Sequence, residues 1–102
     1  MIFITQLIYL KEKQEKIFDE FENVAIPVIT KYNGSLMLRI RPAANTFIEA
    51  GIEKPYEVHI VSFPTEEDFQ DFMKDEERVQ YLHLKNQSIK STLLIKGVKL
   101  NG

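Results

Sequence analysis

The chain has 102 residues, which fits a single domain, and it has no cysteine, which excludes disulfides, thiol nucleophiles and thiolate metal sites. Apolar residues make up 44% and charged residues 27% of the sequence, as in an ordinary globular domain, and the formal net charge is -2. No block of Lys or Arg stands out, so binding to nucleic acid or to an anionic membrane is not expected. We therefore expect one soluble, cytoplasmic domain over residues 1–102.

Residues 2–10 predict a strand, because β-branched and aromatic residues occupy both of its alternating faces. This apolar run is too short to span a bilayer. Residues 11–32 carry apolar side chains at three- and four-residue steps and therefore predict a helix. Pro27 lies inside this helix, so we expect a kink or break near residues 23–25.

Residues 35–41 predict a second strand. Its alternation places three apolar side chains on one face and the others opposite: Leu36, Leu38 and Ile40 against Met37, Arg39 and Arg41. The following connection, residues 43–55, is long for a small domain. Such a connection is either the lid of a site or an ordinary loop held down by Phe47.

Residues 56–63 predict a third strand, which Pro64 ends because proline cannot donate to a sheet. Thr65 is expected to cap a helix that continues to residue 73. Its hydroxyl would accept a hydrogen bond from the backbone N–H of Asp68, whose carboxylate would reach back to the N–H of Thr65.

Residues 75–88 predict a second helical segment with Asp75 as its cap, and residues 91–100 predict the last strand. Gly97 inside that strand indicates a bulge or a close backbone approach. The order is β-α-β-β-α-β. It predicts an α+β, ferredoxin-like fold with a four-stranded antiparallel sheet and helices on one face.

The other face of this sheet would be bare and largely apolar. The alternation assigns to it Phe3, Thr5, Leu7, Met37 and Leu94. An exposed apolar sheet face is an association site. Two such sheets placed face to face would form a homodimeric α+β barrel.

The chain resembles the dimeric α+β barrel superfamily, which includes antibiotic-biosynthesis monooxygenase domains and uncharacterised small domains. The resemblance rests on residues 25–34, on the strand–helix junction at 63–69 and on residues 75–78. It implies the fold, a homodimer and a monooxygenase-like enzyme that needs no cofactor, although haem and flavin stay open because relatives handle such groups. The catalytic Asn, Trp and Tyr of those monooxygenases find no counterpart here, since the chain has no Trp.

Two histidines are the candidate catalytic residues. His59 lies in the middle of a strand, where it is either a base facing a cavity or a hydrogen-bonded histidine on the strand surface. His83 lies on the second helical segment, and it either meets His59 or stays on the helix surface. Two histidines without a placed carboxylate give no metal site.

Arg39, Arg41 and Tyr81 are the candidate substrate-binding residues. Two arginines on one strand face can hold a carboxylate or phosphate, and they can equally pair with Glu57 on the neighbouring strand. The function we expect is a monooxygenase-like enzyme or binder acting on a small organic molecule. Its cavity would lie between helices and sheet, lined by both histidines and the Arg39 region and gated by residues 43–55. The alternative is a non-catalytic dimerisation or ligand-sensing module.

Overall fold

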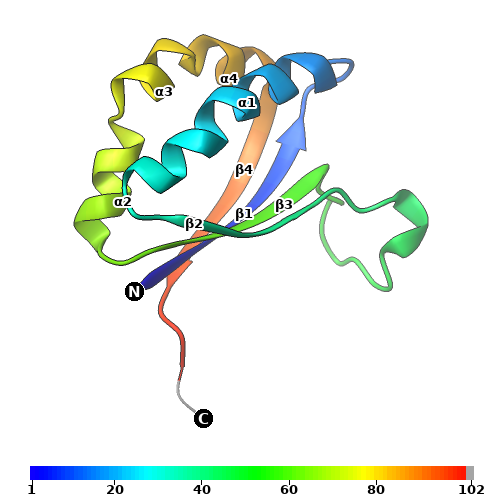
Figure 1. Ribbon diagram of the computed structural model, residues 1–102. Coiled ribbons are helices and arrows are strands. Elements are labelled where there is room, and N and C mark those ends of the chain that lie inside the picture. Colours follow the sequence, from blue (N-terminus) through cyan, green and yellow to red (C-terminus); the bar gives the residue numbers. More distant parts are fainter. Residues whose placement is uncertain (101–102) are drawn as a thin grey trace.

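The computed structural model describes residues 1–100. Figure 1 shows a twisted sheet with the helices on one of its faces. Along the chain the elements are β1 (Ile2–Leu10), α1 (Glu15–Lys31), β2 (Ser35–Ile40), the short 3-10 helix η1 (Ala44–Thr46), β3 (Glu57–Phe63), α2 (Glu66–Met73), α3 (Glu76–Gln80), α4 (Leu82–Ser88) and β4 (Ile89–Gly97). The strands pair in the order β2-β3-β1-β4, and each pairing is antiparallel. The predicted ferredoxin-like α+β fold is confirmed.

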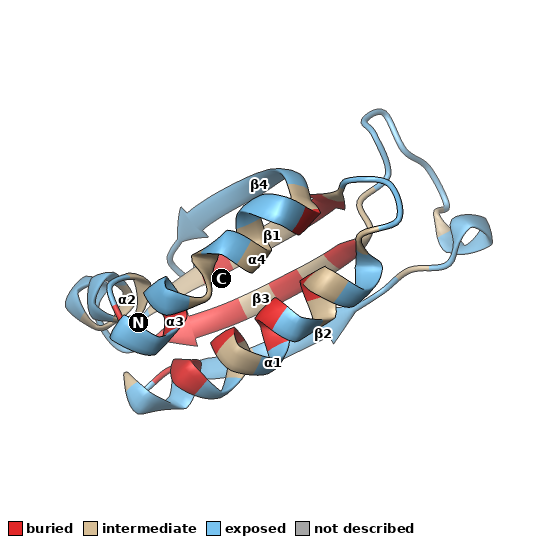
Figure 2. Cartoon of the chain, turned by 90° about the horizontal axis from the view of Figure 1, so that it is seen from above, coloured by how far each residue is buried: buried red, intermediate tan, exposed pale blue. Residues whose placement is uncertain are grey.

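The core lies between the helices and the face of the sheet that they cover. Ile4 of β1 and Val61 and Phe63 of β3 point to this side and pack against Ile29 of α1. Figure 2 shows the buried residues gathered on α1 and β3, whereas β2 and β4 are mostly exposed. Each large apolar side chain buried in this way contributes about 1.5–3 kcal/mol to folding.

The alternation predicted for β2 is wrong, because the register of the β2–β3 pair shifts between Leu36 and Leu38. The extra residue in this bulge is Met37, and a slip of one residue moves every following side chain to the opposite face. Leu36 therefore packs against the core, whereas Leu38 and Ile40 lie on the face without helices. The bulge also brings Arg39 to the helix side.

β4 also differs from its prediction, in its bounds and in the face on which Leu94 lies. It begins at Ile89 and ends at Gly97, and Gly97 pairs regularly with Phe3 instead of forming a bulge. The irregularity in this pairing lies at the other end of the strand, beside Leu10 of β1. Leu94, which was expected on the bare face, pairs with Gln6 and faces the helices.

The helices also differ from expectation. α1 begins four residues later than predicted, at Glu15, and it continues through Pro27 without the expected break. Pro27 is exposed, and the buried residues on either side of it hold the helix against the sheet. The second predicted helical segment is divided at Tyr81 into α3 and α4.

Two predicted caps are confirmed. The hydroxyl of Thr65 accepts from the backbone N–H of Asp68 at 3.1 Å, and a carboxylate oxygen of Asp75 accepts from the N–H of Arg78 at 3.0 Å. The carboxylate of Asp68, however, accepts from the hydroxyl of Thr65 and not from its N–H. Asp75 also accepts from Tyr32 at 2.6 Å, which fastens the end of α1 to the start of α3.

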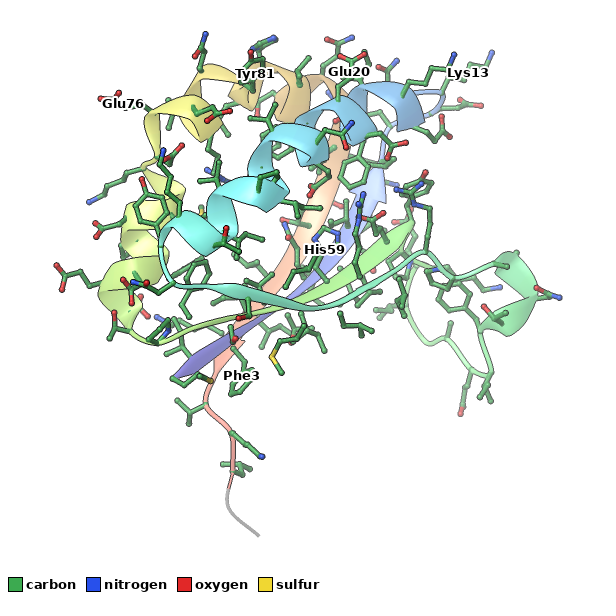
Figure 3. All side chains as sticks on the ribbon, in the orientation of Figure 1. Phe3, Lys13, Glu20, His59, Glu76 and Tyr81 are labelled. Carbon is green, nitrogen blue, oxygen red and sulfur yellow. The ribbon has the colours of Figure 1, made fainter. Side chains whose placement is uncertain are left out.

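The face of the sheet turned away from the helices is called the bare face from here on. The strand pairings place on it Phe3, Thr5, Leu7, Leu38, Ile40, Val58, Ile60, Leu93 and Ile95, together with Tyr9, Ser35, Ser62 and Ser91 toward its ends. None of these residues carries a charge, and Figure 3 shows Phe3 pointing away from the helices. Within residues 1–100, no helix combines the length and the apolarity that crossing a membrane requires.

Candidate functional site

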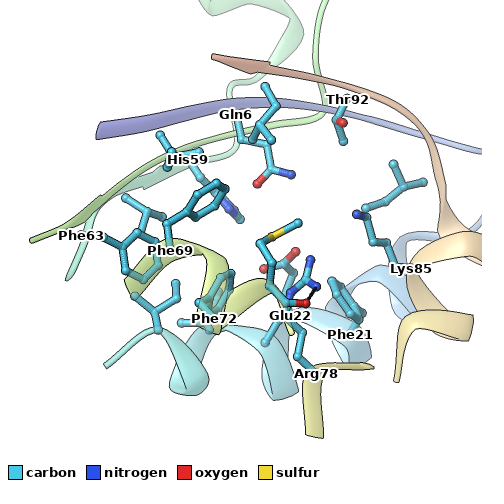
Figure 4. Close-up of a pocket in the computed structure, with 18 residues that line it drawn as sticks. Gln6, Phe21, Glu22, His59, Phe63, Phe69, Phe72, Arg78, Lys85 and Thr92 are labelled. Atoms are coloured by element: carbon cyan, nitrogen blue, oxygen red, sulfur yellow. Dashed lines mark hydrogen bonds between the residues drawn. The ribbon is translucent and has the colours of Figure 1, made fainter. Parts of the chain in front are cut away.

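A cavity of about 90 Å³ lies between the helices and the sheet. Figure 4 shows Phe63, Phe69 and Phe72 gathered at one end of it and Lys85 and Thr92 at the other. Thr92 and Leu94 are exposed although they line the cavity, so its mouth lies at β4, the edge strand. The volume suits a few waters or one small organic molecule.

The alternation of side chains along β3 places the first polar residues at the cavity. Glu57 and His59 are two residues apart on one strand, so both side chains point toward the helices. An oxygen of Glu57 accepts a hydrogen bond from Nε2 of His59. Both side chains are almost fully buried, so of the two alternatives for His59 the one that places it on the strand surface is wrong.

Two arginines from β2 and its end hold the carboxylate of Glu57. Nε of Arg39 donates to one oxygen at 3.1 Å, and Arg41 donates to the other from Nε at 2.8 Å and from a terminal nitrogen at 2.6 Å. Burial by itself would raise the pKa of Glu57, but the hydrogen bonds from His59, Arg41 and Arg39 outweigh it and lower the pKa to about 2. Glu57 is therefore a carboxylate at neutral pH.

This carboxylate fixes the tautomer of His59. Since Nε2 donates to Glu57, Nδ1 of the neutral ring carries a lone pair. Among residues 1–100 no hydrogen bond reaches Nδ1, and the only fully enclosed side-chain polar atom without a partner is Oε1 of Gln14. Nδ1 is thus open to the cavity that the ring lines, where it can accept a proton from a bound molecule.

Glu22 of α1 brings a second carboxyl group to the cavity. It is 7% exposed, and within residues 1–100 its side chain makes no hydrogen bond. Burial raises the pKa of Glu22, and the negative charge of Glu57 adds to this, although His59, Arg39 and Arg78 oppose it. Since its oxygens are not fully enclosed, they too reach the cavity.

Two cations complete the polar lining. Arg78 of α3 is 6% exposed, donates to the carbonyl oxygen of Met73 at 3.1 Å and lies over the ring of Phe72. Lys85 of α4 is partly buried. Burial lowers the pKa of both groups, and the charge of Arg78 lowers the pKa of Lys85 further. In the part of the chain that the structure describes, neither forms a salt bridge.

The structure brings only one of the predicted site residues to the cavity, namely His59. Arg39 and Arg41 bind Glu57 behind it, as in the structural interpretation weighed above. His83 is exposed on α4, with Nδ1 3.2 Å from the carbonyl oxygen of Gln80, and the expected meeting of the two histidines does not occur. Tyr81 packs beside His83 at the helix junction and does not line the cavity.

The predicted gate is also wrong. No residue of the connection 43–55 lines the cavity, and Figure 1 shows this segment projecting from the end of the sheet away from the helices. Within residues 1–100, no group of three or more His, Asp or Glu side chains is placed to hold a metal ion.

Sequence reasoning missed Glu22, Arg78 and Lys85. A signal for Glu22 was present, because it lies on the same helical face as Phe18, Ala25 and other buried residues. A charged residue on an apolar face indicates a buried functional group. Arg78 and Lys85 lie on short helices whose orientation depends on the break at Tyr81, which no pattern indicated.

The arrangement of sheet and helices defines the class: the chain is an α+β protein with a ferredoxin-like fold. No family model matches the sequence, and a search of curated proteins gives no match. Among solved structures, a protein of unknown function from Rhodopseudomonas palustris superimposes with a TM-score of 0.83 at 15% identity, covering 99% of this chain and 83% of that one.

Two other solved structures also have a similar fold. A candidate antibiotic biosynthesis monooxygenase from Nitrosomonas europaea matches with a TM-score of 0.73 at 11% identity, covering 99% of this chain and 100% of the other. A DABB family protein with a ferredoxin-like fold from Mesorhizobium loti matches with a TM-score of 0.67 at 16% identity, covering 98% and 97%. At these identities the likeness establishes the fold alone.

Proposed function

We infer that this protein acts on a small organic molecule in the cavity and that His59 is the general base that removes a proton from it. The observation that carries this proposal is the contact between Glu57 and His59. It commits Nε2 to the carboxylate and leaves Nδ1 as an acceptor at the cavity. The arginines behind Glu57 support the proposal because they keep that carboxylate charged.

The chemistry follows from this arrangement. Nδ1 of His59 takes a proton from an O–H group or from a C–H group beside a carbonyl, and the resulting imidazolium is stabilised by Glu57. A placed general base contributes about 10²–10⁴-fold to the rate of such a step. Gln6 and Thr92 also line the cavity and supply hydrogen-bonding groups that can orient the substrate.

The finer form of the proposal is a monooxygenase-like reaction without a cofactor. The fold shared with the Nitrosomonas europaea protein supports it, and so does the small cavity, which favours a small substrate over a bound haem or flavin. The absence of Trp from the sequence means that the reaction does not depend on that side chain.

The proposal includes a homodimer formed through the bare face. An uncharged apolar sheet face is complementary to a second copy of itself, as a two-fold interface requires. Leu93 and Ile95 are 44% and 51% exposed in the single chain, and pairing the faces would remove them from water.

Deuterium exchange tests the proposed base. Purified protein is incubated in deuterium oxide with 2-butanone, cyclohexanone or 2-oxobutyrate, and loss of the exchangeable C–H signal is followed by NMR while dioxygen uptake is recorded. His59→Gln should reduce the exchange rate by about 100-fold or more, toward the uncatalysed rate. His83→Gln is the matched control, since this second histidine is exposed and does not line the cavity, and it should keep the wild-type rate.

The same experiment decides between the proposal and the non-catalytic module. The specific observation that favours a module is that Arg39 and Arg41 are occupied by Glu57 and serve the fold. If wild-type protein binds these compounds but exchanges no proton faster than His59→Gln, the enzyme proposal fails. The chain is then a binding or dimerisation module.

A further inference from the structure

The charges that face the cavity do not balance. Arg78 and Lys85 bring two basic groups to the lining, whereas Glu22 is the one carboxyl group among the described residues that line the cavity. Glu57 does not compensate them, because its carboxylate is already bound by two arginines and His59. When both basic groups are protonated, they outnumber the one carboxyl group of the lining even if Glu22 is ionised.

The two cations have unused donors. A guanidinium has five N–H groups, and the hydrogen bond that Arg78 makes from its side chain goes to the carbonyl oxygen of Met73. The ammonium of Lys85 makes no hydrogen bond within residues 1–100. Glu22 attracts both cations through space, and Asp75 attracts Arg78, but within residues 1–100 neither cation has a direct ion pair. A buried cation is stabilised by a directly bonded anion, so the free donors at the cavity wall point to an anion that binds there.

The lining is also divided along the length of the cavity. Figure 4 shows Phe63, Phe69 and Phe72 on one side of the cavity and Lys85 on the side of Thr92, where the cavity opens at β4, while Arg78 lies between them with its guanidinium over the ring of Phe72. A ligand that fits this lining has a compact apolar body and one anionic group between the two cations. A neutral ligand would pack against the phenylalanines but would give the two cations no anion to bind.

We propose that the cavity binds a small monocarboxylate, whose carboxylate group is held by Lys85 and Arg78 and whose apolar body packs on the phenylalanines. This inference rests on the proposed function for the site and adds the class of its substrate. The body of such an acid, extending from the cations toward the sheet, lies along the wall that carries His59. Acids with an exchangeable C–H group, such as small 2-oxo acids, meet both requirements.

Binding of charged and neutral isosteres tests the inference. Isobutyrate with isobutyramide and benzoate with benzamide form two pairs that differ in charge and little in shape. Each compound is titrated into ¹⁵N-labelled protein, and the dissociation constant is taken from amide shifts of the cavity residues. The carboxylate of at least one pair should bind about tenfold tighter than its amide.

Lys85→Met removes the charge and keeps the length of the side chain. It should weaken carboxylate binding about tenfold or more and leave amide binding unchanged. The matched control is Lys74→Met, because Lys74 is exposed at the end of α2 and does not line the cavity. Thermal melting of both variants verifies that they fold.

Three results would overturn the inference: no carboxylate binds, amides bind as tightly as carboxylates, or Lys85→Met binds carboxylates like the wild type. These failures are separable from failure of the proposed function. If 2-butanone exchanges its protons in a His59-dependent way while no carboxylate binds, His59 is supported as the general base and the proposed substrate class is wrong. If carboxylates bind through Lys85 but His59→Gln changes no exchange rate, the proposed ligand class is supported and the role of His59 as general base is wrong.

Discussion

Glu57 is the residue on which the candidate site depends. Its side chain is 1% exposed, while those of Arg39 and Arg41 are 33% and 41% exposed, so the arginines keep much of their hydration as they bind it. The loss of hydration therefore falls mainly on one carboxylate, which receives several charge-assisted hydrogen bonds in return. A single residue thus ties β2 to β3 and sets the tautomer of His59.

The stability of the fold should depend on pH through Glu57. Its pKa in the folded protein is about 2 against an ordinary value of 4.5, so the carboxylate stabilises the fold fully above about pH 4.5, and this is lost as the pH falls toward 2. The full shift corresponds to about 3 kcal/mol. Solvent screening at the partly exposed arginines reduces this stabilisation. We therefore expect Glu57→Gln to lower the free energy of unfolding at pH 7 by about 2 kcal/mol.

Urea unfolding at several pH values checks this prediction. The wild type should lose stability between pH 5 and 2 more steeply than Glu57→Gln. Glu53→Gln is the control, because Glu53 pairs with Lys90 and its side chain is 60% exposed. Equal pH slopes in wild type and Glu57→Gln would contradict the role assigned to Glu57.

Glu22 should affect stability in the opposite direction. Its pKa is raised in the folded protein, so the fold binds the proton more tightly than the unfolded chain, and stability falls as the pH rises above the ordinary value of 4.5. Glu22→Gln removes this loss and should stabilise the protein at pH 7 by about 1 kcal/mol, as at other functional sites that cost stability. An unchanged or lower melting temperature at pH 7 would show that the buried carboxyl is compensated.

At the level of elements, the junction between α1 and β2 is the most tightly constrained. Asn33 adopts a positive φ of 63° there, and Gly34 follows it. A Cβ at Gly34 would lie 2.7 Å from Cγ2 of Ile29 and 2.7 Å from Cε1 of Phe63. The helix can therefore approach the end of β3 only because residue 34 has no side chain.

Gly34→Ala should destabilise the protein by about 2 kcal/mol, since the methyl group must displace Ile29 or Phe63 in a packed core. Gly51→Ala is the matched control, because a Cβ at Gly51 has no neighbour within 4 Å. Chemical denaturation of the two variants makes the comparison. Equal free energies of unfolding would mean that the core around residue 34 accommodates a methyl group without losing stability.

Much of the fold could be predicted because its signals are local. The bounds of β1 and the caps at Thr65 and Asp75 follow from residue types within a few positions of one another. The bulge at Met37 could not be predicted, because a register shift depends on the facing strand. That shift decides which side of the sheet Arg39 occupies, so the contact with Glu57 was visible only as an alternative.

The candidate site was less predictable for the same reason. His59 and Glu57 lie on one strand, and their proximity follows from the period of a strand. Glu22, Arg78 and Lys85 come from three helices, and only the packing of those helices brings them to one cavity. The charge balance of the cavity, which indicates the ligand, is thus a tertiary property.

For the whole molecule, the decisive feature is a thin domain with one covered face. The Cα atoms extend over 41 × 36 × 16 Å, which is one sheet and one layer of helices. A sheet in this position usually alternates apolar and polar residues, but the bare face is largely apolar and carries no charge on any of the four strands. Covering it with a second sheet is the solution that the sequence favours.

A charge on the bare face should therefore abolish the proposed dimer. Sedimentation equilibrium of the wild type should give twice the chain mass of 11.9 kDa. Ile95→Lys places an ammonium group on the apposed apolar faces, so the dimer should weaken by about 100-fold or more. Val79→Lys is the control: Val79 is 46% exposed on α3, so the same charge is added away from the sheet, and the dimer should persist. A monomeric wild type, or equal masses for Ile95→Lys and Val79→Lys at micromolar concentration, would mean that something other than a second copy covers this face.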